Sequence, residues 1–78
     1  SELLKWLIEK MKRLGKMKQV IELIDEKIDF LNQQNGAGAL MRLAGWFDES
    51  KVNTVIDSNK IVINELTDLR MKVLELML

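Results

Sequence analysis

Hydrophobic residues recur with a seven-residue period over residues 2–33, so that they occupy the first and fourth positions, a and d, of successive heptads. With Leu7 assigned to position a, the only interruption is Lys10 at a d position. This spacing places the apolar side chains on one face of an α-helix. The polar run from Asn32 to Gly36 follows, and Asn and Gly commonly end helices because they tolerate the left-handed conformation. The pattern therefore predicts a first helix over residues 2–33.

The same pattern returns over residues 50–77. Its only polar member is Asn59, at an a position. Asp48 and Ser50 are both suitable N-cap residues for this second helix. Two helices of similar length, joined by a connection that contains glycines, predict an antiparallel hairpin. The hydrophobic a and d residues of this segment are Val52, Val55, Val62, Leu66, Leu69, Val73 and Leu76.

The connection between the two segments combines glycine and alanine with large apolar side chains. Its apolar residues spaced three or four positions apart are Leu40, Leu43, Ala44 and Phe47. This spacing favours a short helix over residues 37–47 with one apolar face. Gly38 and Gly45 lower the stability of such a helix because glycine has a low helix propensity.

Both long segments carry an apolar stripe that is wider than a two-helix contact requires. The stripe extends onto the e positions at Leu4, Met11, Ile56, Ile63 and Met77. An a/d/e face is typical of helical bundles, and one hairpin cannot cover two such faces. We therefore predict an all-α fold, in which a long antiparallel helical hairpin with a short connecting helix is completed into a four-helix or larger bundle by self-association.

Composition removes most classes of chemistry. The chain has 78 residues, which is enough for one small domain, and it contains no His, Cys, Pro or Tyr. Without imidazole or thiol groups the usual proton shuttle, nucleophile and zinc ligands are missing, so we expect no enzyme activity, no cofactor and no metal site. No apolar run approaches the length of a membrane span and no cleavable signal peptide is recognisable, which favours a cytoplasmic protein.

The charges cancel over the whole chain but are unevenly distributed. Residues 1–18 contain six basic and two acidic side chains, whereas residues 19–49 contain two basic and six acidic ones. The basic segment, with Trp6 at its polar boundary, also has the pattern of a membrane-surface amphipathic helix, and its cations could instead contact nucleic acid. The candidate contacts to an anionic surface are Lys5, Lys12, Arg13, Lys16 and Lys18.

The connection is the segment that the two long helices explain least. Large apolar side chains beside glycines suit a site that anchors a partner protein, although they could equally cap the end of the core. We accordingly interpret the chain as a non-enzymatic protein-protein interaction module, such as a small regulator, adaptor or assembly subunit that binds itself and another protein. The candidate partner-binding residues are Leu40, Met41, Leu43, Trp46 and Phe47.

Asn59 interrupts an otherwise apolar series. A buried Asn at an a position pairs with another amide and thereby fixes register and partner number. The alternative is that the helix rotates and exposes the side chain to solvent. We predict the first role, with Asn59 setting the register of the oligomer.

Overall fold

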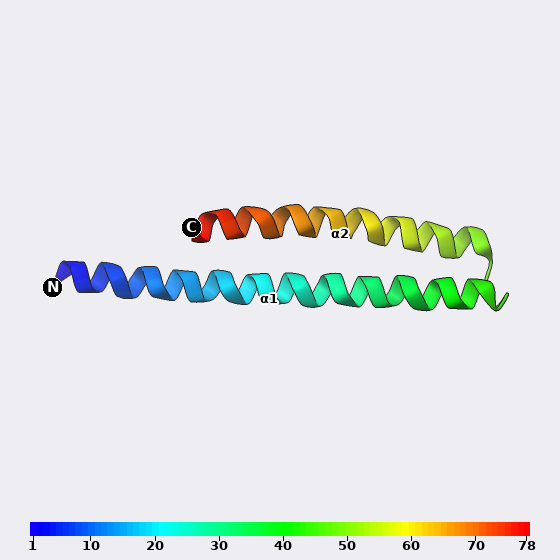
Figure 1. Ribbon diagram of the computed structural model, residues 1–78, viewed down its shortest axis with the longest axis horizontal. Coiled ribbons are helices and arrows are strands. Elements are labelled where there is room, and N and C mark those ends of the chain that lie inside the picture. Colours follow the sequence, from blue (N-terminus) through cyan, green and yellow to red (C-terminus); the bar gives the residue numbers. More distant parts are fainter.

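Two long helices account for nearly the whole chain in the computed structural model, which describes residues 1–78 (Figure 1). Helix α1 spans Glu2–Leu43 and helix α2 spans Glu49–Met77, and they run antiparallel over the length of α2. The molecule is a rod with dimensions of 67 × 15 × 13 Å. The predicted all-helical antiparallel hairpin is confirmed.

Helix α1 continues through the polar and glycine-rich residues that were expected to end it. The expectation that it stops near Gln33, and that a separate short helix spans residues 37–47, is wrong. The heptad pattern in fact extends further, with Asn35, Gly38 and Arg42 at the next a and d positions, and these residues face α2. Contacts with the second helix therefore stabilise a stretch whose own helix propensity is low.

The true end of α1 lies at Gly45, which has a positive φ of 73°. The backbone N–H of Trp46 donates to the carbonyl of Met41 (3.1 Å), and that of Gly45 donates to the carbonyl of Arg42 (3.1 Å). This pair of hydrogen bonds is the Schellman motif, which satisfies the last carbonyls of a helix and favours glycine at the left-handed position. The connection is thus a short turn of residues 44–48, without a helix of its own.

Helix α2 begins with a side-chain cap. The carboxylate of Asp48 accepts a hydrogen bond from the backbone N–H of Ser50 (2.9 Å), so Asp48, rather than Ser50, is the N-cap. Its backbone is extended (φ −61°, ψ 121°), as expected for a residue just outside a helix. The hairpin turn is therefore defined on both sides, by a glycine that ends one helix and an aspartate that starts the next.

The core of the hairpin is small. Only Ile21, Ile24 and Leu31 are buried, all of them on α1 near the middle of the rod. The other a and d residues of α1 from Leu14 to Arg42 are half-buried. Helix α1 therefore contacts α2 through its predicted a/d face.

Helix α2 contacts α1 mainly through its a and e positions rather than through its a and d positions. Apart from Asn53, its half-buried residues fall at the a and e positions, whereas its d positions are exposed. The a and e residues are Val52, Ile56, Asn59, Ile63, Leu66, Arg70, Val73 and Met77. Hydrogen bonds from Asn59 and Arg70 to α1 hold the a/e edge against the neighbouring helix. A single neighbouring helix covers about two of the three apolar lines formed by the a, d and e positions of α2, so the residues of the third line remain exposed to solvent. The d residues Val55, Val62, Leu69 and Leu76, expected in the seam, thus form an exposed stripe.

Candidate functional site

The candidate partner-binding residues lie together at the hairpin end of the rod. All five are exposed, most strongly Leu43 (82 %) and Trp46 (75 %). Leu40, Met41 and Leu43 belong to the last turn of α1, whereas Trp46 and Phe47 lie in the turn itself. The hairpin end is therefore an apolar surface contributed by consecutive residues.

A groove of about 340 Å³ lies beside this end, between the two helices. Met41 and Phe47 form part of its wall, and Val52 and Val55 of α2 form another part. Its floor passes Gly38, where a side-chain carbon, if one were added, would lie 3.5 Å from a methyl group of Val52. A methyl group at this position would therefore make only ordinary van der Waals contact with α2.

A polar layer crosses the helix contact next to the groove. The amide nitrogen of Asn59 donates to the side-chain oxygens of Gln34 and Asn35, both at 2.9 Å. The amide nitrogen of Asn35 donates in turn to the backbone carbonyl of Ile56 (3.4 Å). Asn59 therefore has its partners within its own chain, and it fixes the register of α2 against α1.

Two further polar contacts join the helices on the side of the helix contact away from the groove. Arg42 donates to the side-chain oxygen of Asn53. Arg70 forms a salt bridge with Asp25 at 2.8 Å. Sequence reasoning missed Gln34, Asn35 and Arg42, although extending the heptads of the first segment past Leu31 places Asn35 and Arg42 at a positions.

The five candidate basic residues are all exposed but do not share one surface. Lys5 and Lys12 lie seven residues apart on one line of α1, and Lys16 lies one turn beyond Lys12. Lys18 projects from another side of the helix, at an e position. Three of the five cations thus share one side of α1, and Lys18 lies apart from them.

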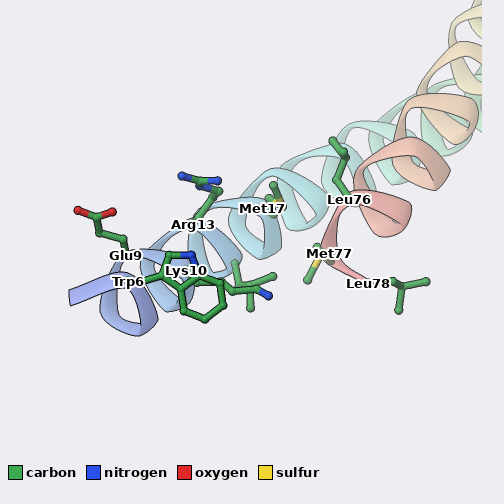
Figure 2. A pocket seen from close by; sticks show the side chains of 9 residues that line it. Trp6, Glu9, Lys10, Arg13, Met17, Leu76, Met77 and Leu78 are labelled. Atoms are coloured by element: carbon green, nitrogen blue, oxygen red, sulfur yellow. The ribbon is translucent and has the colours of Figure 1, made fainter. Parts of the chain in front are cut away.

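The remaining basic residue, Arg13, lies in a second hollow, of about 390 Å³, where the end of α2 meets α1 (Figure 2). Its lining includes Trp6, Lys10 and Arg13 of α1, Leu76 and Met77 of α2, and Leu78 just after α2. The ammonium group of Lys10 lies 4.9 Å from the centre of the Trp6 ring, a cation–π distance. The lysine side chain thus partly covers an aromatic ring here.

No side chains gather in a way that would hold a metal ion. Neither helix has a stretch sufficiently long and apolar to cross a bilayer. No family model matches the chain, and no curated protein or solved structure matches it either. The interpretation of function therefore depends on the surfaces of the hairpin.

Proposed function

We propose that the chain is a non-enzymatic interaction module that associates with other helices, first of all with further copies of itself. The observation that carries the proposal is the mismatch between apolar content and burial. Hydrophobic residues make up 47 % of the sequence, yet only three residues are buried. The molecule exposes 6498 Å² to solvent, whereas a compact monomer of 9.1 kDa exposes about 4,900 Å².

Association with other helices would remove this exposed apolar surface from water. Each apolar Å² removed from water stabilises the assembly by about 25 cal/mol, so covering even about 400 Å² of apolar surface contributes roughly 10 kcal/mol before the costs of association. The largest apolar patch on a monomeric protein is typically about 300–600 Å² and is often an interaction surface. The proposed product is a bundle of four or more helices.

Sedimentation equilibrium at micromolar concentration tests the proposal. We expect a mass of at least twice the 9.1 kDa of one chain, and a fall toward 9.1 kDa on strong dilution. A 9.1 kDa species that persists at the highest attainable concentrations would refute self-association as the working state of the protein.

The hairpin end is the surface that we propose for a second, different partner protein. Trp46 and Phe47 are large, exposed and close to a groove, which are properties of side chains that anchor protein interfaces. The double variant Trp46→Ala/Phe47→Ala should retain the far-UV circular dichroism of the wild type, because neither side chain is part of the core. The variant Ile61→Ala/Met71→Ala removes comparably exposed apolar groups from the outer side of α2 and is the matched control.

Two results would contradict this assignment. Loss of helix content in the hairpin-end variant alone would place the aromatic residues in the core. Equal capture of a copurifying protein by the wild type, the hairpin-end variant and the control would show that the partner docks elsewhere.

A membrane surface is the second candidate, and it is favoured by the exposed apolar side chains near the start of α1. Leu4, Ile8 and Met11 lie on one side of the helix and are all exposed, while Lys5 and Lys12 lie on the adjoining side. This is the arrangement of helices that lie in the bilayer interface. Co-sedimentation with vesicles rich in phosphatidylserine tests it, and a protein that stays in the supernatant at low salt would exclude it.

A further inference from the structure

We infer that a second copy of the chain covers one particular side of the hairpin, the lateral face. The inference rests on the self-association proposed above and specifies the surface that carries it. We define the lateral face by two lines of residues, Val55, Val62, Leu69 and Leu76 on α2, and Val20, Lys27, Gln34 and Met41 on α1.

The groove at the hairpin end shows that these two lines lie on the same side of the rod. Gln34 and Met41 of α1 line this groove together with Val55 of α2. Residues seven apart stay on one line of a helix within a coiled contact. The α1 line therefore continues from Gln34 back to Val20, and the α2 line continues from Val55 to Leu69.

The opposite side of the seam is polar. It carries the salt bridge between Asp25 and Arg70 and the contact between Arg42 and Asn53. Within the two helices, the positions seven residues from Asp25 and Asn53 are also polar, namely Lys18, Asn32 and Lys60. On α2, an unbroken line of aliphatic residues thus follows only the flank that faces away from these polar contacts, which selects the lateral face for association.

The α2 line lies at the edge of the helix contact, where α1 covers it only in part: Val62 is 37 % and Leu76 is 72 % exposed. Leu69 is 46 % exposed, and Val55 and Val62 are exposed as well, yet every member of the line is Val or Leu. A line of aliphatic residues repeated every seven positions fits against another helix with the same repeat. Both helices of this chain have that repeat, so a second copy offers the matching surface.

Size and charge are also compatible with a second copy. Over the 29 residues of α2, about 44 Å at 1.5 Å per residue, a face 15 Å wide offers roughly 650 Å² per chain. Two such faces together bury about 1,300 Å², which lies within the range of stable interfaces. The net charge of the chain is zero, so two copies do not repel each other overall. A two-fold axis would bring the same face of each chain together.

A pair of charge substitutions on α2 tests the inference by sedimentation equilibrium. Leu69→Glu places a carboxylate on the lateral face, and we expect the mass to fall at least twofold, to 9.1 kDa. Ile61→Glu is the matched control, because Ile61 is even more exposed (60 %) but lies at a c position, on the side of α2 away from α1. The control should keep the mass of the wild type.

The outcomes separate the two proposals. A wild-type protein that is monomeric would refute self-association itself. An oligomeric wild type whose mass is unchanged by Leu69→Glu would leave self-association intact and refute the lateral face as its surface. Equal dissociation by both substitutions would also refute the lateral face, because only a general effect of the added charge would then be seen.

A second measurement keeps the inference testable if Leu69→Glu fails to fold. The natural chain has no cysteine, so Leu69→Cys and Ile61→Cys each introduce a single thiol. Alkylation by iodoacetamide at Leu69→Cys should slow at least about twofold between dilute and concentrated protein, because mass action fills the interface. The rate at Ile61→Cys should stay constant. The same concentration dependence at both positions would overturn the inference.

Discussion

Replacing glycines one at a time tests where α1 ends. Gly36 lies inside the helix, and a side-chain carbon added there meets nothing within 4 Å. Gly45 follows the helix and has a φ of 73°, a conformation that side-chain-bearing residues rarely adopt. The same chemical change, Gly→Ala, should therefore act in opposite directions at the two positions.

The magnitudes follow from the local backbone. Alanine is more favourable than glycine by about 0.8–1.0 kcal/mol in a helix interior, so Gly36→Ala should stabilise the protein by nearly that amount. Alanine in the left-handed conformation costs about 1–2 kcal/mol, so Gly45→Ala should destabilise it. In a domain of this size about 1 kcal/mol corresponds to roughly 4–8 °C in Tm.

Thermal unfolding followed by far-UV circular dichroism measures both effects. The proteins must be compared at equal concentration, because association raises the apparent stability. We expect a higher Tm for Gly36→Ala and a lower Tm for Gly45→Ala. A lower Tm for Gly36→Ala would refute the reasoning, because it would show that the chain leaves the helix at Gly36.

Three further predictions concern the contact between the helices. Asn59→Leu should lower the free energy of unfolding by about 1 kcal/mol, because it leaves the side chain of Asn35 without one of its hydrogen-bond partners. The double variant Asn35→Leu/Asn59→Leu should regain the lost stability. Urea unfolding measures both variants, and a single variant as stable as the wild type would contradict the polar layer. Gly38→Ala should be tolerated, since the added carbon lies 3.5 Å from Val52. Gly38→Leu should lower the free energy of unfolding by about 1–3 kcal/mol, because the larger side chain does not fit between the helices. Equal Tm values for the two variants would show that the helices are further apart there. Asp25→Asn should cost less than about 1 kcal/mol in urea unfolding, because both partners of its salt bridge are still partly exposed to solvent. A larger loss would indicate burial in an assembly.

The seven-residue pattern is sufficient to predict the two helices and the face of α1 that contacts α2. It fails at Gly36 because a cap inferred from single residues neglects the contact with a distant segment that stabilises the helix there. Asn35 donates to the backbone of Ile56, twenty-one residues away. Continuing the heptads for about three more turns would have placed Asn35 and Arg42 in the seam and pointed to Gly45 as the end.

The rotation of α2 could not be predicted from the pattern. Its a, d and e positions are mostly apolar, so three lines compete for contact with a single neighbouring helix. The choice is made by polar groups whose partners lie on the other helix, such as Arg70 with Asp25. The same limit applies to Asn59, whose polar partners are in its own chain rather than in a second copy.

The rod shape determines how the protein will behave in solution. Its radius of gyration is 18.8 Å, compared with about 11.5 Å for a compact domain of 78 residues. A single chain will therefore elute from a gel-filtration column ahead of globular standards of equal mass, so an early peak alone is no sign of a dimer. X-ray scattering avoids this ambiguity because it reports mass and longest dimension together. Pairing through the lateral face doubles the scattering mass while the longest dimension grows by far less than twofold, whereas joining end to end nearly doubles both.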